Sequence, residues 1–253
     1  MTVGETRPAT RPSYTGASVQ VTFDGFLFDM DGTIIDSTDA VVKHWHTVGN
    51  EIGVAPEVIL ETSHGRRSID ILKLIAPEKA NWEYVCDMEG RLPKLYGGDA
   101  VEIPGARALL DSLRAQKAPW AIVTSGTQPL VNGWLGVLNL PKPEHLISAE
   151  SVANGKPDPT CYNMGLKALS LTGNHNVLVL EDSPAGIQAG KDAGCKVLGL
   201  VTSHTAEQVA KASPDWIVQD LTSVRVVSIE AQSDGGVQTT LEFSNLLVLP
   251  NNA

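Results

Sequence analysis

Two aspartates stand one residue apart directly after an apolar run near the start of the chain. In "FLFDMDGT" (26–33), Asp29 and Asp31 follow three apolar residues and precede Gly32. Two neighbouring carboxylates repel each other unless a cation or a proton lies between them. Mg²⁺ prefers such oxygen ligands and also binds substrate phosphates. We therefore expect a magnesium site at the end of this run.

The later apolar runs also end in polar side chains. Thr124 and Ser125 end the second run, Lys156 comes shortly after the third, and Glu181 and Asp182 end the fourth. In open α/β sheets the active site lies beyond the carboxyl ends of the strands. We therefore expect these side chains to meet the first two carboxylates in one crevice.

This set of residues is suited to phosphoryl transfer. Asp29 can attack phosphorus and form an aspartyl phosphate, as carboxylate nucleophiles do. Asp31 can protonate the leaving alkoxide and then take a proton from the water that hydrolyses the intermediate. Thr124 and nearby backbone N–H groups can donate to the phosphoryl oxygens, while Lys156 offsets the negative charge.

Each residue also has a structural explanation when it is considered alone. Asp and Gly form turns after strands, Thr124 or Ser125 can cap the next helix, and Lys156 can be a solvated loop residue. Glu181 and Asp182 can favour the start of a helix through its dipole. Their joint occurrence at successive strand ends favours the catalytic interpretation.

The order of the secondary-structure elements predicts an α/β fold. Nearly continuous apolar runs of strand length are typical of strands that are covered on both faces. Segments with helical spacing separate these runs, which indicates a parallel sheet with right-handed crossovers. The predicted strands span 26–28 with its flanks, 120–124, 145–149, 176–181, 196–202 and 215–220, and the predicted helices span 105–116, 128–139, 159–170 and 184–193.

A long insertion separates the first predicted strand from the second. Residues 37–101 contain no convincing strand, so we expect an inserted helical cap domain there. Its helix-like stretches lie at 39–51, 68–75 and 82–95.

The rest of the chain is assigned to a tail and a core domain. Residues 1–20 hold two prolines and many small polar residues, which predicts a flexible tail. The core domain then comprises 21–36 and 102–253. Near its end, a hairpin signal around Ser233 to Gly236 predicts two strands that extend a sheet edge.

The composition argues against several classes of protein. A net charge of −10 without clustered Lys and Arg argues against nucleic acid and anionic membranes as partners. No apolar run is long enough to cross a bilayer, and the N-terminus lacks a secretory pattern, so we expect a cytoplasmic protein. Three widely spaced cysteines fit neither a disulfide framework nor a zinc site. We expect a monomer that acts on a small-molecule phosphomonoester.

Four successive motifs resemble those of haloacid-dehalogenase-type phosphotransferases. The motifs are "DMDGT", "TSGT", "GKPDP" and "EDSPAGIQAGKDAGC", and the resemblance covers about residues 21–220. It implies a Rossmann-like core with Asp29 as nucleophile and Asp31 as general acid and base. An acid at position 31 favours a phosphatase or a phosphomutase over a dehalogenase.

The resemblance also implies which residues bind the metal and the phosphate. The expected Mg²⁺ site comprises Asp29, the backbone carbonyl of Met30, Asp31 and Asp182, with Glu181 assisting. The residues expected around the phosphoryl group are Gly32, Thr33, Thr124, Ser125, Gly126 and Lys156.

A narrower resemblance links the chain to glycerol-phosphate phosphatases and the related 2-deoxyglucose-6-phosphate phosphatases. It rests on "SHGRRSIDIL" (63–72), "EGRLPKLYG" (89–97), "PGA" (104–106) and "WAIVTSGT" (120–127). In the cap, His64, Gly65 and Arg67 match the His-Gly-x-Arg pattern of that group, with Arg66 in the variable place. The match implies a cap loop that contacts substrate, since a guanidinium offers paired hydrogen-bond donors.

These observations favour a Mg²⁺-dependent phosphatase that acts on glycerol 3-phosphate or glycerol 1-phosphate. A hexose 6-phosphate, including the 2-deoxy analogue, is the alternative substrate. Two other functions stay open: a sugar phosphomutase, which returns the phosphoryl group to the substrate, and a catalytically silent binding protein on the same fold.

Overall fold

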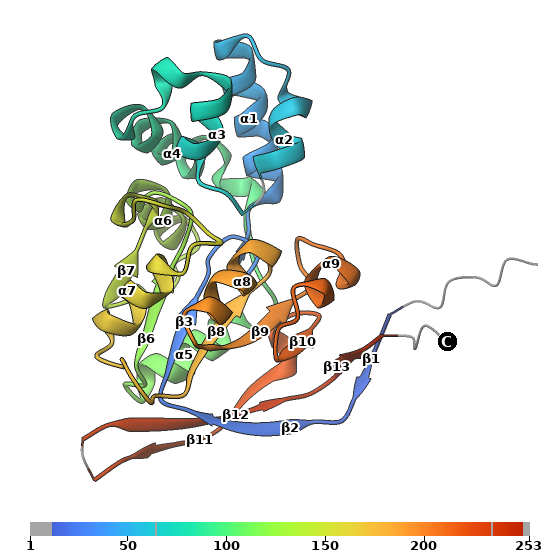
Figure 1. Ribbon diagram of the computed structural model, residues 1–253, viewed down its shortest axis with the longest axis vertical. Helices are drawn as coiled ribbons and strands as arrows, with labels where there is room; N and C mark the ends of the chain where they lie inside the picture. Colours follow the sequence, from blue (N-terminus) through green and yellow to red (C-terminus); the bar gives the residue numbers. More distant parts are fainter. Residues whose placement is uncertain (1–11, 64, 234, 250–253) are drawn as a thin grey trace, which may run out of the picture.

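A six-stranded parallel sheet forms the centre of the molecule (Figure 1). The computed structural model describes residues 12–63, 65–233 and 235–249, and the strand order is β10-β9-β8-β3-β6-β7. All neighbouring pairs are parallel, which confirms the predicted α/β fold. The chain winds outward from β3 in both directions, so the switch point of the sheet lies at β3. The strands are β3 (Gly25–Phe28), β6 (Trp120–Val123), β7 (His145–Ile147), β8 (Val177–Glu181), β9 (Lys196–Leu200) and β10 (Trp216–Val218).

Helices cover both faces of this sheet. Phe26 and Phe28 pack into one apolar cluster with residues of α5 and α6, whereas Leu27 packs into a second cluster with α7, α8 and α9. Because successive side chains of a strand point to opposite faces, strands covered on both sides read as continuous apolar runs. None of the helices in the described ranges has the length and apolar character needed to cross a membrane. The bounds are α5 (Ala106–Ala115), α6 (Gln128–Val137), α7 (Thr160–Ala168), α8 (Pro184–Asp192) and α9 (Ala206–Lys211).

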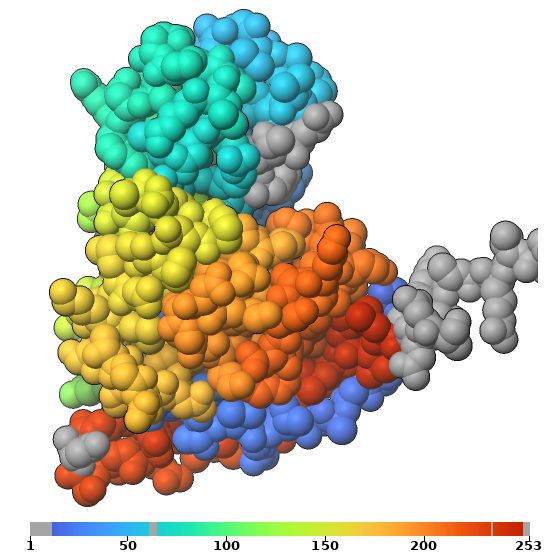
Figure 2. Space-filling model, viewed as in Figure 1, coloured from blue at the N-terminus to red at the C-terminus, as the bar shows by residue number. Residues whose placement is uncertain are grey.

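Four helices form a lobe above the carboxyl ends of the strands (Figures 1 and 2). The chain leaves the core through β4 (Ile35–Asp36) and returns through β5 (Val101–Glu102), and these two short strands pair with each other. The lobe has its own apolar cluster, which includes Trp45, Ile71 and Val85. Its helices are α1 (Thr38–Ile52), α2 (Pro56–Ser63), α3 (Ser68–Ile75) and α4 (Trp82–Tyr96). Helix α2 was not among the predicted elements.

A second sheet packs against the core from below in Figure 1. Its order is β11-β12-β2, with β2 at Val19–Phe23, β11 at Val224–Ala231 and β12 at Val237–Phe243. The predicted hairpin is confirmed, but it does not extend the parallel sheet, because its apolar face packs through Leu241 and Phe243 onto the core cluster.

The prediction of a flexible tail over residues 1–20 is wrong from residue 13 onward. Strand β1 (Ser13–Gly16) pairs with β13 (Leu246–Val248), and β2 pairs with β12. The alternation of apolar and polar residues in "VQVTF" is typical of a strand with one covered face, and partners more than two hundred residues away complete it. Residues 1–11 lie outside the described ranges.

Candidate active site

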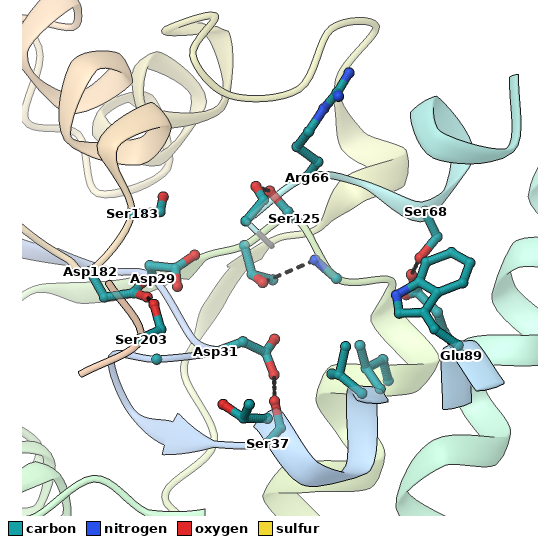
Figure 3. A pocket seen from close by; sticks show the side chains of 18 residues that line it. Asp29, Asp31, Ser37, Arg66, Ser68, Glu89, Ser125, Asp182, Ser183 and Ser203 are labelled. Atoms are coloured by element: carbon teal, nitrogen blue, oxygen red, sulfur yellow. Dashed lines mark hydrogen bonds between the residues drawn. The ribbon is translucent and has the colours of Figure 1, made fainter. Parts of the chain in front are cut away.

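The polar residues at the strand ends meet in one pocket between the sheet and the helical lobe (Figure 3). Asp29 follows β3, Thr124 follows β6 and Asp182 follows β8, and all three line the pocket together with Asp31. The switch point of a parallel sheet leaves room for a ligand between diverging loops. The predicted convergence of these side chains is therefore present in the structure.

Lys156 lies between two carboxylates at the base of the site. Its Nζ donates to Asp29 Oδ1 at 2.6 Å, to Glu181 Oε1 at 2.6 Å and to the carbonyl oxygen of Val123 at 3.2 Å. The Lys156 side chain is only 3% exposed. Burial by itself lowers the pKa of Lys156, but the charges of Asp29 and Glu181 outweigh this and raise that pKa above its ordinary value. The lysine is therefore a permanent cation beside Asp29.

The pocket holds more negative charge than Lys156 neutralises. Burial raises the pKa of Asp29 well above its usual range, and the charges of Glu181 and Asp182 add to this effect while Lys156 opposes it. Among the described residues, no donor reaches Asp29 Oδ2. A carboxylate oxygen without a donor, inside an acidic cluster, is suited to binding a cation or attacking an electrophile.

Asp31 is held by the first residues of the lobe. Ser37 Oγ donates to Asp31 Oδ1, and Ser37 precedes helix α1 directly. The pKa of Asp31 is raised to about 6, chiefly by burial and also by the charge of Asp182, while the hydrogen bond from Ser37 opposes this rise. A carboxyl group with a pKa near neutrality is able both to donate and to accept a proton.

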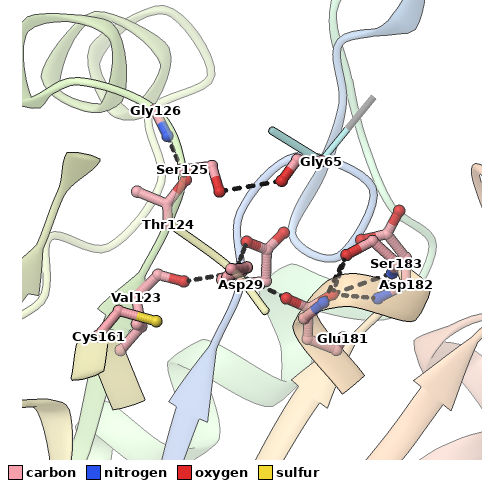
Figure 4. A network of polar contacts seen from close by, with 12 residues as sticks. Asp29, Gly65, Val123, Thr124, Ser125, Gly126, Cys161, Glu181, Asp182 and Ser183 are labelled. Carbon is pink, nitrogen blue, oxygen red and sulfur yellow. Dashed lines mark hydrogen bonds and ion pairs between the residues drawn. The ribbon is translucent and has the colours of Figure 1, made fainter. Parts of the chain in front are cut away.

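Glu181 organises the site through five hydrogen bonds. Its Oε1 accepts from Lys156 Nζ and Tyr162 OH. Its Oε2 accepts from the backbone N–H of Asp182 and from the N–H and Oγ of Ser183 (Figure 4). Ser183 also caps α8 through the N–H of Gly186. The acceptor positions of Glu181 are thus filled, so it acts as a support for its neighbours rather than as a direct metal ligand.

The chemistry of the donor set fits a divalent cation. Carboxylate oxygens of Asp29, Glu181 and Asp182 all lie within 4.8 Å of one another. The oxygens of Glu181 already accept hydrogen bonds, so those of Asp29 and Asp182 are the ones available to a cation. The prediction that the backbone carbonyl of Met30 binds the metal is wrong. This oxygen accepts hydrogen bonds from the N–H groups of Thr33, Ile34 and Ile35 in the turn after β3. The neighbouring carbonyl of Asp31 accepts no hydrogen bond from the residues described.

The residues expected around the phosphoryl group have different positions. Gly32, Thr124, Ser125 and Gly126 line the pocket. Thr124 Oγ1 accepts the N–H of Gly126 at 3.0 Å, which leaves the hydroxyl hydrogen available for a ligand. Thr33 does not line the pocket, because its side chain is fully buried in the turn. Apart from Thr33, the residues expected around a phosphoryl group line the pocket or, for Lys156, contact Asp29 at its base.

The cap loop differs from its prediction at Arg67. Its guanidinium is only 3% exposed and does not line the pocket. It forms an ion pair with Asp70 and donates to three core carbonyl oxygens, those of Ala149, Val152 and Ala153. A buried guanidinium is stable only when acceptors surround it. Because core carbonyl oxygens supply most of these acceptors, Arg67 joins the lobe to the core.

The neighbours of Arg67 occupy the pocket instead. Gly65 and Arg66 both line it, and the carbonyl of Gly65 accepts a hydrogen bond from Ser125 Oγ at 3.1 Å. His64, the other expected substrate contact, lies outside the described residues.

Several pocket residues were not predicted. Ser203 follows β9 and donates to Asp182 Oδ2, so applying the rule of strand ends to one more strand identifies it. Ser68 and Glu89 come from the lobe and form a hydrogen bond inside the pocket. No local pattern distinguishes them from other polar residues of amphipathic helices, so the folded lobe is required to reveal them.

The parallel core, the acidic pocket at its switch point and the helical lobe over this pocket together define a class of hydrolytic enzyme. The family model for haloacid dehalogenase-like hydrolases matches residues 26–211. The chain belongs to this family, and the resemblance inferred from the four sequence motifs is confirmed.

Curated relatives and solved structures agree with this family. Glycerol-1-phosphate phosphohydrolase 1 of Saccharomyces cerevisiae is 38% identical over 82% of this chain and 86% of its own. 2-Deoxyglucose-6-phosphate phosphatase 2 of the same yeast is 36% identical over 82% of this chain and 92% of its own. A hydrolase from Pseudomonas syringae has the same fold, with a TM-score of 0.65 and 22% identity over 78% of this chain and 94% of its own.

Proposed function

We propose that this hydrolase removes the phosphoryl group from a small polyol or sugar phosphate through an aspartyl-phosphate intermediate on Asp29. The main support is the contact of Asp29 with the buried Lys156, whose Nζ lies 2.6 Å from Asp29 Oδ1. Asp29 also lines the same pocket as Asp31. The names of the two yeast relatives support this class of substrate.

In the first step, Asp29 attacks phosphorus and the bond to the substrate oxygen breaks. Lys156 holds Oδ1 of Asp29, so Oδ2 is the oxygen available for attack. Asp31 gives its proton to the departing alkoxide, which its raised pKa permits. The hydroxyl hydrogen of Thr124 donates to the transferring oxygens, because Thr124 Oγ1 accepts the N–H of Gly126 and its own hydrogen stays available.

In the second step, a water molecule attacks the phosphorus of the aspartyl phosphate. Asp31 is now ionised and takes a proton from this water, so one residue acts first as acid and then as base. Inorganic phosphate leaves, and Asp29 returns to its starting state. The lobe over the pocket excludes bulk water during the first step.

Mg²⁺ is the cofactor that we propose for the acidic cluster. The ligands from this chain are the carboxylates of Asp29 and Asp182 and the backbone carbonyl of Asp31. When bound, the ion supplies positive charge that stabilises the phosphoryl oxygens and relieves repulsion among the carboxylates. Glu181 supports this site by holding Lys156 and the backbone of Asp182.

Glycerol 1-phosphate or glycerol 3-phosphate is our first choice of substrate. It is supported by the relative that is 38% identical and bears glycerol 1-phosphate in its name. A hexose 6-phosphate is the second candidate, supported by the relative that is 36% identical and named for 2-deoxyglucose 6-phosphate.

Phosphate release tests the proposed function. The purified protein is assayed with glycerol 1- and 3-phosphate, glucose 6-phosphate and 2-deoxyglucose 6-phosphate, with Mg²⁺ and then with a chelator. We expect release that requires Mg²⁺, the highest kcat/KM on a glycerol phosphate, and no measurable turnover by Asp29→Asn. Absence of release from all four esters, or an Asp29→Asn variant with nearly full activity, contradicts the proposal.

A further inference from the structure

Glu89 is a buried acid on the side of the pocket opposite Asp29. It belongs to helix α4 of the lobe, is 5% exposed and lines the pocket with Ser68 and Trp45. Figure 3 shows Glu89 and Ser68 at one end of the pocket and Asp29 and Asp182 at the other, with Asp31 between them. A leaving group that receives a proton from Asp31 therefore extends toward Glu89.

The protein itself leaves part of the Glu89 carboxylate unused. Oε1 accepts from Ser68 Oγ at 2.5 Å, and Oε2 accepts from the backbone N–H of Thr127 at 2.8 Å. Within the described part of the chain, no Lys, Arg or His forms an ion pair with it. The Thr127 hydroxyl also stabilises the charge of Glu89. A carboxylate has about four acceptor positions, so these neutral donors leave room for a further one. Glu181, by contrast, has five donors and the charge of Lys156.

Burying a carboxylate with so few partners is unfavourable. Burial raises the pKa of Glu89 to about 7, although the hydrogen bonds from Ser68 and Thr127 act in the opposite direction. A glutamine of the same shape accepts the N–H of Thr127 equally well without the cost of desolvating a charge. The acid is therefore better explained by a ligand that donates hydrogen bonds to it.

We infer that Glu89 binds a hydroxyl group of the leaving group and thereby selects polyol and sugar phosphates against esters with an acidic leaving group. This inference rests on the proposed phosphatase function. A hydroxyl donates to an ionised carboxylate in a charge-assisted hydrogen bond. A carboxylate on the leaving group instead meets like charge in a buried site.

Ser68 and Arg66 complete the recognition site in different ways. The Ser68 hydroxyl donates to Glu89, so its oxygen accepts from a second hydroxyl of the substrate. Arg66 also lines the pocket, and its cation could attract an acidic leaving group. Its side chain is exposed, however, and extends away from Asp29 and Asp31 in Figure 3. Solvent weakens the effect of its charge, so Glu89 determines selectivity.

The test compares three phosphomonoesters with and without the carboxylate. Glycerol 3-phosphate carries two hydroxyls, n-propyl phosphate has the same carbon chain without them, and 3-phosphoglycerate replaces the terminal alcohol by an acid. Glu89→Gln retains an acceptor for the N–H of Thr127. Its amide nitrogen donates to Ser68 Oγ, so the contact with Ser68 is kept with the direction of the hydrogen bond reversed. Glu83→Gln, an exposed position on the same helix, is the matched control.

We expect Glu89→Gln to lower kcat/KM on glycerol 3-phosphate by roughly 10- to 100-fold, the range for one charge-assisted hydrogen bond. We expect a loss of less than about threefold on n-propyl phosphate, and a higher ratio of 3-phosphoglycerate to glycerol 3-phosphate turnover. Glu83→Gln leaves all three rates unchanged. Thermal unfolding of Glu89→Gln close to that of the wild type shows that the loss is not a folding defect.

Four results overturn the inference. Equal fractional losses on glycerol 3-phosphate and n-propyl phosphate make Glu89 a structural residue, and unchanged selectivity for 3-phosphoglycerate removes the role of its charge. A wild-type protein that hydrolyses neither these three esters nor the hexose 6-phosphates named above refutes the proposed function as well. A wild type that prefers glycerol 3-phosphate, together with an unaffected Glu89→Gln, refutes this inference alone.

Discussion

Replacing Lys156 by methionine removes the one cation within hydrogen-bond reach of Asp29 among the residues described here. The lysine Nζ lies 2.6 Å from Asp29 Oδ1 and 2.6 Å from Glu181 Oε1, and the three side chains are 3%, 9% and 0% exposed. Methionine occupies similar space but leaves two buried carboxylates without a counter-charge. Breaking a buried ion pair in this way costs about 3–5 kcal/mol, a large part of the roughly 5–15 kcal/mol that stabilises a typical domain.

Urea denaturation near neutral pH, followed by tryptophan fluorescence with a chelator present, measures this loss. We expect Lys156→Met to lower the free energy of unfolding by about 3–5 kcal/mol. Lys196→Met is the matched control, because Lys196 pairs with Asp215 while its own side chain is 52% exposed. Such a surface pair contributes less than about 1 kcal/mol.

A double variant checks the cause of the loss. Asn at position 29 removes one of the charges that Lys156 neutralises, so the two substitutions together are less harmful than their sum. We expect a coupling free energy of at least about 1 kcal/mol between Lys156→Met and Asp29→Asn. Additive effects, or a Lys156→Met loss equal to that of Lys196→Met, refute the reasoning about charge balance in the pocket.

Three further predictions address other parts of the structure. Gly186→Ala places a Cβ 1.6 Å from Glu181 Oε1, so we expect it to abolish activity. The Cβ of Gly136→Ala meets nothing within 4 Å, so this variant keeps its activity and raises the unfolding midpoint. Equal effects of the two substitutions contradict the role of Gly186. Arg67→Lys lowers kcat/KM on glycerol phosphate and on an aryl phosphate to the same extent, because Arg67 joins the lobe to the core. A loss confined to glycerol phosphate shows instead that Arg67 contacts the substrate. Burial lowers the pKa of His44 from 6.5 to about 4, so the unfolded chain takes up a proton between these pH values while the folded chain does not. As the pH is lowered through that range, the unfolding free energy of the wild type therefore falls by as much as about 3 kcal/mol more than that of His44→Phe. Urea titration at each pH measures both values, and parallel pH profiles of the two proteins disprove the assignment.

The core and its strand ends could be predicted because their signals are local. Strands covered on both faces, such as Gly25–Phe28, appear as apolar runs, and the residues at their carboxyl ends meet because the strands are parallel. Strand β2 was missed because its partner β12 lies more than two hundred residues away. Helix α9 was also missed, although Thr205 and Gln208 form a capping box at its start.

The cap contacts were harder to predict because a residue type does not show where a side chain points. Arg66 and Arg67 are adjacent and chemically identical, yet one lines the pocket and the other is buried against core carbonyls. Which of them faces the site depends on the backbone of the loop before α3 and on the packing of the lobe against the core. Glu89 was missed for the same reason, since only the folded lobe brings α4 over the pocket.

Direct detection of a phosphorylated Asp29 tests the proposed mechanism most directly. In Asp31→Asn, p-nitrophenyl phosphate still transfers its phosphoryl group, because the nitrophenolate needs no proton to leave, but the base for water attack is missing. After acid quench and mass spectrometry, we expect a phosphoryl group on the peptide that contains Asp29, formed with a matching burst of nitrophenolate. Turnover of the same ester without a burst, and with that peptide unmodified, contradicts covalent catalysis by Asp29.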